Sequence, residues 1–346
     1  MALRIRENEQ LAPRTTLELG GAARFFAEAA SVDEIEEAVR TARERGLRLA
    51  VLGGGSNLLV ADEGFDGLVL AIASKGRTSK PGPDGTMLVR AEAGESWDEL
   101  VAWTVESGWQ GLECLAGIPG LVGSTPVQNV GAYGQEVADT LVEVEVFDRE
   151  RGERRTMPRA ECGFAYRDSA LKRAAGRFIV SAVTFALRPN AAAPIRYAEL
   201  QKALGGSEER DVAKVREVVL RLRRSKSMVV DPSDPNRRSA GSFFTNPIVA
   251  AEVADDVARR SGEGTMPRWA QPDGRVKLAA GWLIERAGIA KGLRMGNVGV
   301  SSAHALALVH HGGGTTRELL ALAEHVVGAV ERRFGVRLER EPVLLG

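Results

Sequence analysis

Residues 117–134 read Gly117-Ile-Pro-Gly-Leu-Val-Gly-Ser-Thr-Pro-Val-Gln-Asn-Val-Gly-Ala-Tyr-Gly134. The stretch is denser in glycine and less polar than a structural loop of this length normally is. Glycine lets the backbone come close to a bound ligand, and Gln128, Asn129 and Tyr133 add polar side chains. This stretch therefore predicts a ligand-binding loop.

A second glycine loop, Gly53-Gly54-Gly55-Ser56-Asn57, follows the apolar stretch 47–52, which is predicted to be a strand. Backbone N–H groups in such a loop form an anion-binding nest, and Ser56 and Asn57 add side-chain donors. A tight turn without a ligand explains this motif alone equally well. The loop is neither a Rossmann fingerprint nor a P-loop, since it leads into a predicted strand and lacks Gly-Lys-Ser/Thr. Two such loops, about 60 residues apart, favour a dinucleotide lying between two small lobes.

Length and charge favour a soluble protein of two or three domains. The chain has 346 residues, with 46 Lys plus Arg against 46 Asp plus Glu. Because the formal net charge is zero, no overall positive field exists to bind nucleic acid or an anionic membrane. The N-terminus does not resemble a signal peptide, and no run of ~18 apolar residues predicts a membrane span. We expect a cytoplasmic monomer that binds neither nucleic acid nor membrane.

The cysteines and histidines show no metal-binding pattern. Cys114 and Cys162 are far apart, and the first of the four histidines is His304. We expect two buried, reduced thiols and no metal ion. The pattern argues against zinc chemistry and against triad hydrolysis.

Local signals predict an α+β chain. Capped helices are expected at 31–45 and 96–108. The other predicted helices lie at 208–226, 249–261, 278–287 and 316–334. Strands are predicted at 47–52, 58–61, 68–72, 141–147, 177–187 and 305–309.

The stretch 189–194, rich in Pro and Ala, is the best candidate for a linker. We therefore predict an N-terminal domain over residues 1–200, with lobes at about 1–75 and 76–200. The second domain would cover residues 201–346.

Three short strings carry candidate catalytic residues. Arg167, in Tyr166-Arg167-Asp168-Ser169, could bind a carboxylate through two hydrogen bonds, although a surface arginine paired with Asp168 is the commoner arrangement. Ser242, between Gly241 and two phenylalanines, could donate a proton away from bulk water, or could simply cap a turn. Glutamates near the C-terminus, including Glu341, are usually solvated.

Taken together, these strings resemble the UDP-N-acetylenolpyruvoylglucosamine reductase family, and residue 197 favours its first structural type. The resemblance covers residues 15–341 and rests on three strings, which are residues 117–134, 166–169 and 241–247. It implies a two-lobed FAD-binding domain of the vanillyl-alcohol-oxidase-like (PCMH) type. An α+β substrate-binding domain would follow, with the last residues returning to the active site.

The resemblance implies non-covalent FAD as cofactor and NADPH as co-substrate. Both glycine loops are expected to hold the FAD. The cofactor-binding residues implied are Gly53, Gly54, Gly55, Ser56, Asn57, Gly117, Ile118, Gly123 and Ser124.

The reaction implied is reduction of UDP-N-acetyl-3-O-(1-carboxyvinyl)-glucosamine to UDP-N-acetylmuramate, a precursor for peptidoglycan synthesis. In this family NADPH reduces the flavin, and flavin N5 then sends a hydride to C3 of the enolpyruvyl group. Arg167 corresponds to the arginine that stabilises the developing negative charge, and Ser242 to the serine that protonates C2. Glu341 corresponds to the C-terminal glutamate beside them, with Glu339 as the alternative.

The resemblance also assigns substrate contacts. Tyr133, Lys226 and Asn246 correspond to residues that contact the UDP-sugar, and Tyr197 to a loop tyrosine that folds over the nucleotide. The sequence departs from the family at Ser124-Thr125, where Gly-Ala is commoner, so Thr125 is expected to crowd the flavin slightly. It also departs at His310-His311, where asparagine is usual, and at Pro342, where valine is usual.

Two other functions fit parts of the sequence. A flavin oxidase of a small alcohol or hydroxy acid would share the fold, but such enzymes often attach FAD through a histidine, and none precedes His304. A non-catalytic sugar-nucleotide-binding protein would not require Arg167, Ser242 and Glu341 together.

Overall fold

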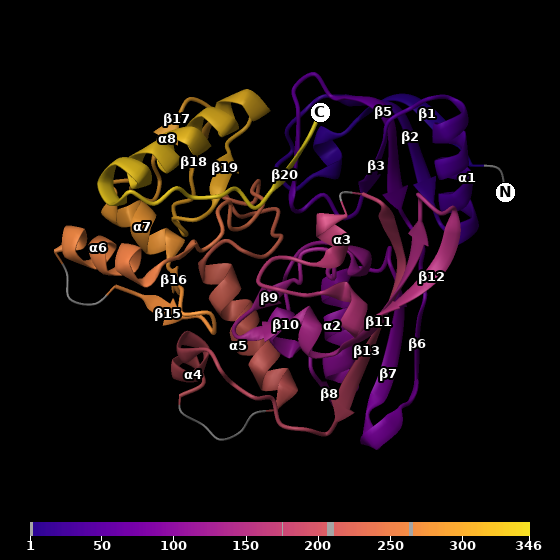
Figure 1. The fold of residues 1–346 in the computed structure, drawn as a ribbon, viewed down its shortest axis with the longest axis horizontal. Coiled ribbons are helices and arrows are strands. Elements are labelled where there is room, and N and C mark those ends of the chain that lie inside the picture. Colours follow the sequence, from indigo (N-terminus) through magenta and orange to yellow (C-terminus); the bar gives the residue numbers. More distant parts are fainter. Residues whose placement is uncertain (1–2, 175, 206–210, 263–265) are drawn as a thin grey trace. The chain divides into compact units, whose positions relative to one another are not determined.

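Buried apolar side chains gather into two separate cores, and the chain divides with them into two units. Figure 1 labels helices and strands of both units. The computed structural model describes residues 3–174, 176–205, 211–262 and 266–346. Unit 1 comprises Met1–Glu9, Ala23–Gly54 and Asp66–Val230. Unit 2 comprises Gln10–Ala22, Gly55–Phe65 and Asp231–Gly346.

The first lobe of unit 1 is a four-stranded sheet with one helix. In sheet order, its strands are β1 (Ile5–Gln10), β2 (Ala22–Ala29), β5 (Phe65–Ile72) and β3 (Leu49–Leu52). Helix α1 (Val32–Glu44) begins at the predicted cap, since the Ser31 hydroxyl accepts a hydrogen bond from the Glu34 N–H at 3.3 Å. The Glu34 carboxylate in turn accepts a hydrogen bond from the Ala30 N–H at 2.6 Å, one residue before the cap.

The second lobe of unit 1 is an antiparallel sheet built around one long strand, β13. Its main path, in sheet order, is β12 (Glu153–Pro158), β11 (Leu141–Asp148), β13 (Phe178–Pro189), β7 (Met87–Glu92) and β6 (Arg77–Pro81). The short β8 (Trp109–Gln110) pairs with the end of β13. The strands predicted at 141–147 and 177–187 are thus confirmed, each slightly longer than expected.

Helix α2 (Trp97–Glu106) lies beside this sheet and carries a fully buried tryptophan. Trp97 packs against Phe185 of β13, with ring centroids 5.9 Å apart. Its indole N–H donates to the Leu115 carbonyl at 3.1 Å, so the ring is buried with its one polar group satisfied. This bond ties α2 to the segment that enters the loop at Gly117.

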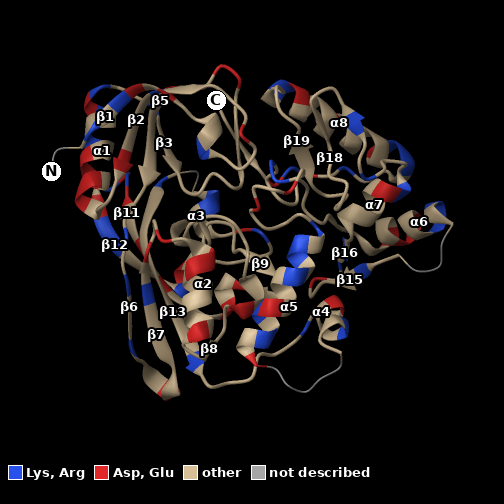
Figure 2. Ribbon diagram, turned by 180° about the vertical axis from the view of Figure 1, so that it is seen from behind, with Lys and Arg blue, Asp and Glu red and all other residues tan. Residues whose placement is uncertain are grey.

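Helix α5 (Val212–Ser225) belongs to unit 1, although it follows the expected linker. Its N-cap is Asp211, so the predicted helix 208–226 begins later than expected, and residues 208–210 lie outside the described residues. Lys and Arg recur along it, as Figure 2 shows. After α5 the chain stays in unit 1 as far as Val230, and the predicted linker 189–194 also lies within unit 1. The division at residue 200 into a cofactor-binding and a substrate-binding domain stays a prediction.

Unit 2 packs three helices around short sheets. The helices are α6 (Ala251–Ser261), α7 (Ala280–Arg286) and α8 (Thr316–Phe334). The strands are β14 (Ile248–Val249), β16 (Val276–Leu278) and β15 (Arg268–Ala270), then β17 (Arg294–Met295), β18 (Val298–Val300) and β19 (Leu308–His310). The final strand β20 (Val343–Leu345) pairs in parallel with β4 (Leu58–Val60), so both ends of the sequence contribute to this unit.

The predicted elements of unit 2 agree with the structure except at one strand. Helix α8 spans the predicted residues, with a complete capping box between Thr315 and Glu318. The strand expected at 305–309 is β19 and begins later, because residues 301–307 form a turn closed by the Ser301 N–H donating to the Ala307 carbonyl.

His310, one of the departures from the family pattern, is a buried residue of unit 2 that forms two hydrogen bonds. Its Nδ1 lies 3.1 Å from the Leu17 carbonyl, and its Nε2 accepts from the Gly314 N–H at 3.0 Å. An Nε2 acceptor together with an Nδ1 donor requires the neutral ring. Burial lowers the pKa of His310, and the Arg238 charge lowers it further, although the bond to Leu17 opposes both effects.

We predict that this histidine makes unit 2 less stable in mild acid. Because the pKa is lower in the folded state than in the unfolded state, the unfolded chain binds the proton first as pH falls below about 6.5. The free energy of unfolding should therefore decrease as pH falls through that value and level off below the folded-state pKa. His310→Asn should flatten this dependence in urea unfolding between pH 7.5 and 5.5.

His325 provides the matched control, because it is exposed on α8. His325→Asn should leave the pH dependence of the wild type unchanged. An equal effect of the two substitutions would contradict the role given to His310.

Candidate functional site

The two glycine loops touch each other within unit 1. A Cβ placed on Gly54 would lie 2.6 Å from the Cα of Gly120, and one placed on Gly53 would overlap the Ser124 hydroxyl. Only glycine allows the two backbones to approach so closely. The structure thus brings together the two loops that the sequence suggested would act as a pair.

Internal hydrogen bonds preform the second loop. The Gly117 N–H donates to the Asp98 carboxylate at 2.7 Å, the Gly123 N–H to the Ala93 carbonyl at 2.9 Å and the Ser124 N–H to the Leu121 carbonyl at 3.0 Å. Gly117, Gly123 and Ser124 are expected to bind the cofactor. Their N–H groups form hydrogen bonds within the protein and so fix the conformation of the loop.

Thr125, expected to crowd the flavin, is buried within this second loop. Its hydroxyl donates to the Val122 carbonyl at 2.8 Å. The hydroxyl group that Thr125 adds relative to the family pattern thus forms its hydrogen bond within its own turn.

The rest of the first loop belongs to unit 2. Gly55 has φ of +65°, and its carbonyl accepts from the Thr16 N–H at 3.2 Å. The Asn57 amide donates to the Glu341 carbonyl at 3.4 Å, and the Asn57 carbonyl accepts from Val343 N–H at 3.1 Å. In unit 2 the end of the glycine loop is therefore bonded to the C-terminal segment that carries the predicted catalytic glutamate.

A buried arginine beside the second loop was missed by sequence reasoning. Arg223 is only 9% exposed, and its Nη2 donates to the Met228 carbonyl at 2.6 Å. Its Nε is buried and has no hydrogen-bond partner among the described residues. A Cβ on Gly117 would lie 3.4 Å from that Nε, so the arginine reaches the loop where glycine leaves space.

A cation that is buried with an unused donor fits a loop that binds a polar, negatively charged cofactor. Burial lowers the pKa of Arg223, which the nearby Tyr133 and Asp98 oppose. A helical signal could have identified this residue. Val212, Val215 and Val219 form a buried stripe on α5, and Arg223 continues the stripe.

Three predicted substrate residues lie together in unit 1. The rings of Tyr133 and Tyr197 meet edge to face with centroids 5.5 Å apart, and the Lys226 ammonium lies 5.9 Å from the Tyr133 centroid. The Lys226 Nζ donates to the Glu199 carboxylate at 2.7 Å. Burial raises the pKa of Tyr133 to about 12, so its phenol keeps its proton at neutral pH. The cluster offers two aromatic faces and a cation, a combination suited to a nucleotide phosphate.

Arg167 lies on a constrained loop of unit 1. It has φ of +55°, and its Nη2 donates to the Gly131 carbonyl at 2.8 Å. The simpler alternative, a pair between Arg167 and Asp168, is wrong, because Asp168 binds Arg173 instead. The hydrogen bond to Gly131 thus holds the Arg167 guanidinium beside residues 117–134.

Asn129 ties these two segments together from the other side. It is 1% exposed, and its amide donates to Glu136 at 2.7 Å and to the Ala165 carbonyl at 3.2 Å. Its own carbonyl oxygen accepts from the Ala138 N–H at 3.0 Å. The polar side chain of this loop therefore positions the backbone around Arg167.

Ser242 follows Gly241, which has φ of +68°, and is half-buried in unit 2. The serine was expected to be dry, and its exposure is intermediate, although Phe243 and Phe244 beside it are buried. The Glu341 N–H donates to the Phe243 carbonyl at 3.0 Å. The C-terminal segment thus runs directly beside the serine turn.

The backbone hydrogen bonds between the C-terminal segment and the serine turn distinguish the two candidate glutamates. Glu341 is half-buried and bonds to the residue next to Ser242. Glu339 is exposed, and its carbonyl accepts from Thr245 N–H at 3.0 Å, further from the serine. This arrangement favours Glu341.

Asn246, predicted to contact substrate, has a structural bond as well. Its side-chain oxygen accepts from the Ala280 N–H at 2.9 Å, at the start of α7. The asparagine therefore helps to begin a helix, a role that the sequence did not reveal.

The thiols behave as expected. Cys114 and Cys162 are buried and form no disulfide, and burial raises their pKa values to about 12 and about 11. Among the described residues, no group of His, Cys, Asp and Glu side chains could hold a metal ion. Within the same residues, no helix is long and apolar enough to cross a membrane.

Two family descriptions match separate parts of the chain. Residues 23–157 match the FAD binding domain, and residues 232–345 match the C-terminal domain of UDP-N-acetylenolpyruvoylglucosamine reductase. Two curated enzymes of that name are similar over nearly their whole length. The Thermobifida fusca enzyme is 50% identical over 347 residues, covering 98% of this chain and 97% of the relative. The Saccharopolyspora erythraea enzyme is 50% identical over 345 residues, covering 97% and 94%.

The crystal structure of the Thermus caldophilus UDP-N-acetylenolpyruvylglucosamine reductase superposes with a TM-score of 0.67 at 28% identity, over 99% of this chain and 100% of that one. This match and the FAD-binding domain confirm the predicted fold class, an FAD-binding domain of the vanillyl-alcohol-oxidase-like type in an α+β chain. Since the likeness to the curated enzymes extends across both units, the chain belongs to the UDP-N-acetylenolpyruvoylglucosamine reductase family.

Proposed function

We propose that this protein reduces UDP-N-acetyl-3-O-(1-carboxyvinyl)-glucosamine to UDP-N-acetylmuramate with NADPH and FAD, as a cytoplasmic monomer in peptidoglycan precursor synthesis. The observation that carries the proposal is the 50% identity to a UDP-N-acetylenolpyruvoylglucosamine reductase over 98% of the chain. The residues expected for this reaction are all present, in the order expected.

Bound FAD would supply the two-electron chemistry. In this proposal Gly53, Gly54 and the preformed loop from Gly117 to Ser124 hold the cofactor, and the buried Arg223 donates to it. Gly55, Ser56, Asn57 and Ile118 complete the set of cofactor-binding residues.

Arg167 stabilises the negative charge that develops on the substrate carboxylate. Its bond to the Gly131 carbonyl holds the guanidinium in place before the substrate binds, so little reorganisation is needed. Losing one preorganised donor of this type costs on the order of 3 kcal/mol of transition-state stabilisation.

Ser242 donates the proton to C2, and Glu341 assists it. The turn at Gly241 and the buried phenylalanines hold the serine backbone, since the Phe243 N–H donates to the Leu306 carbonyl at 2.8 Å. A hydroxyl is a weak acid in water, so its partial burial and a neighbouring carboxylate are what make this role feasible.

The UDP-sugar diphosphate binds the cation of Lys226, beside Tyr133 and Tyr197, and Asn246 contributes a further contact. Lys226 forms an ion pair with the Glu199 carboxylate. The diphosphate would compete with this carboxylate for the ammonium group.

The test is anaerobic flavin spectroscopy of the purified protein. Wild-type protein should be yellow, lose its colour with NADPH and regain it with the enolpyruvyl UDP-sugar. Recovery only with oxygen would instead support the oxidase, and a protein that binds UDP-sugar but no FAD would support the binding protein.

Ser242→Ala should separate the two halves of the reaction. Flavin reduction by NADPH should stay normal, because the serine acts only on the substrate, whereas reoxidation should slow roughly 10²–10⁴-fold. Ser233→Ala, at an exposed serine of the same unit, is the control and should match the wild type. Normal reoxidation of Ser242→Ala would reject the serine as the acid.

A pair of conservative substitutions tests the choice of glutamate. Glu341→Gln should slow reoxidation by about 10²-fold, the scale of one catalytic group, and leave reduction by NADPH unchanged. Glu339→Gln, in the exposed neighbour, should have no effect. The opposite ranking would transfer the role to Glu339.

Glu199→Gln should lower KM for the UDP-sugar without changing kcat. A partly exposed ion pair contributes ~0.2–1 kcal/mol, so freeing Lys226 should lower KM by up to about fivefold. Glu217→Gln breaks a comparable pair with Lys214 on α5 and serves as the control. An increase in KM would instead show that Glu199 orients Lys226 for the substrate.

A further inference from the structure

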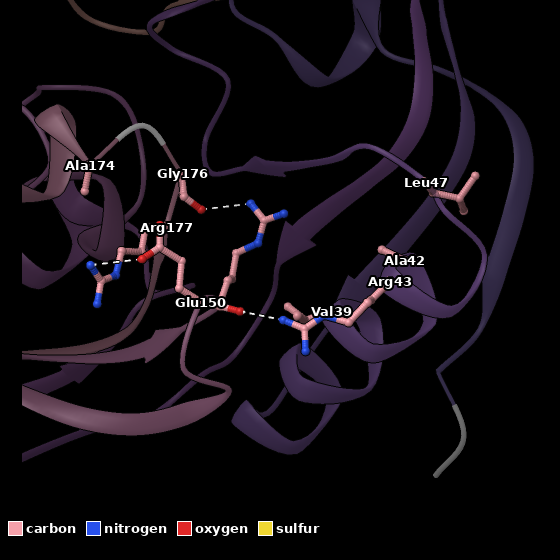
Figure 3. A pocket seen from close by; sticks show the side chains of 9 residues that line it. Val39, Ala42, Arg43, Leu47, Glu150, Ala174, Gly176 and Arg177 are labelled. Carbon is pink, nitrogen blue, oxygen red and sulfur yellow. Dashed lines mark hydrogen bonds and ion pairs between the residues drawn. The ribbon is translucent and has the colours of Figure 1, made fainter.

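Unit 1 contains a cavity of about 360 Å³ that shares no residue with the proposed site (Figure 3). It lies where the end of α1 faces the turn after β11 and the segment before β13. Leu47, in its wall, precedes β3, whereas Gly53 follows that strand. The cavity and the glycine loop are therefore at opposite ends of β3.

Two arginines of this cavity donate hydrogen bonds to backbone carbonyls. The Arg149 Nη1 donates to the Gly176 carbonyl at 2.8 Å, and the Arg43 Nη2 donates to the Arg149 carbonyl at 3.0 Å. Within the part of the chain that the structure describes, neither forms an ion pair. Burial lowers the pKa of Arg149, and the Arg43 charge lowers it further, which is the electrostatic cost of bringing the two cations together.

A third arginine is already compensated. Arg177 binds the fully buried Asp148 through two nitrogens, at 3.0 Å and 2.6 Å, and its Nη1 lies 3.1 Å from the Glu150 carboxylate. Glu150 is exposed and lines the cavity, so it can turn toward water. The site thus keeps an excess of positive charge even with both carboxylates in place.

Part of the lining, beside Arg43, is apolar. Val39 and Ala42 of α1, together with Leu47, present only hydrocarbon to the cavity. A water molecule occupies about 30 Å³ in the liquid, so an inorganic ion would fill only a small part of this volume. The combination of guanidinium groups and a hydrocarbon wall calls for a ligand with an anionic head and an apolar body.

We propose that this cavity binds a small organic phosphate, whose phosphate contacts Arg43 and Arg149 and whose apolar part rests on α1. The phosphate supplies a negatively charged partner for the two arginines. It also joins α1 of the first lobe to the β11–β13 region of the second, so binding stabilises unit 1. The inference does not depend on the proposed reaction.

Calorimetry with phenyl phosphate tests it on the FAD-loaded protein saturated with UDP-N-acetylmuramate. Arg43→Met and Arg149→Met should each weaken binding by about tenfold or more, the scale of one charge-assisted hydrogen bond. Arg40→Met is the matched control, because Arg40 is exposed on the same helix and does not line the cavity. It should bind like the wild type.

Arg43 is exposed, so its substitution should not disturb folding even if that of Arg149 does. Inorganic phosphate should bind at least about tenfold more weakly than phenyl phosphate, because it cannot use the apolar wall. The proposal is overturned if Arg43→Met and Arg40→Met bind phenyl phosphate equally well, if inorganic phosphate binds as tightly, or if saturation with UDP-N-acetylmuramate abolishes binding.

Discussion

The close approach of Gly54 to Gly120 is the constraint on which the rest of unit 1 depends. A Cβ on Gly54 would lie only 2.6 Å from the Cα of Gly120, so no side chain fits between the two loops. The loops can meet only because their supports hold them there, through the bonds of Gly117 to Asp98 and of Gly123 to Ala93. The sheets, α2 and the buried Trp97 therefore act as a frame that holds two stretches of bare backbone against each other.

Unit 2 uses a different device, the pairing of distant segments. The turn at Ser242, the segment at Glu341 and the end of the glycine loop at Asn57 are joined by backbone hydrogen bonds and by one bond from the Asn57 side-chain amide. The backbone bonds set the position of the segments without using the side chains of Ser242 and Glu341. This explains how residues far apart in sequence can be held in register by only a few bonds.

Much of the fold could be predicted from local sequence signals. The elements that were missed have physical reasons for being missed. Helix α8 was predicted correctly because Thr315, Glu318 and Gly335 mark its ends unambiguously. Strand β1 was missed, since Ile-Arg-Glu-Asn-Glu-Gln shows no apolar alternation and owes its conformation to its partner β2.

The site shows the same division between local and tertiary information. The glycine loops could be identified from composition, whereas the meeting of Tyr133, Tyr197 and Lys226 was suggested only by family resemblance. The burial of Arg223 could have been inferred from the apolar stripe that it continues on α5. The bond between Asn246 and Ala280 depends on tertiary packing, which no local pattern encodes. The pairing of Asp168 with Arg173 was missed for the same reason.

The parallel pairing of β20 with β4 has a consequence for the order in which the protein can be made. Asn57 and Glu341, which flank this pair, are 284 positions apart, so β4 is synthesised long before its partner β20. Because a contact between distant residues must first close a long loop, unit 2 is expected to complete its folding late. Until β20 has been synthesised and has paired with β4, the Gly55–Asn57 segment lacks the hydrogen bonds that Asn57 forms with Glu341 and Val343.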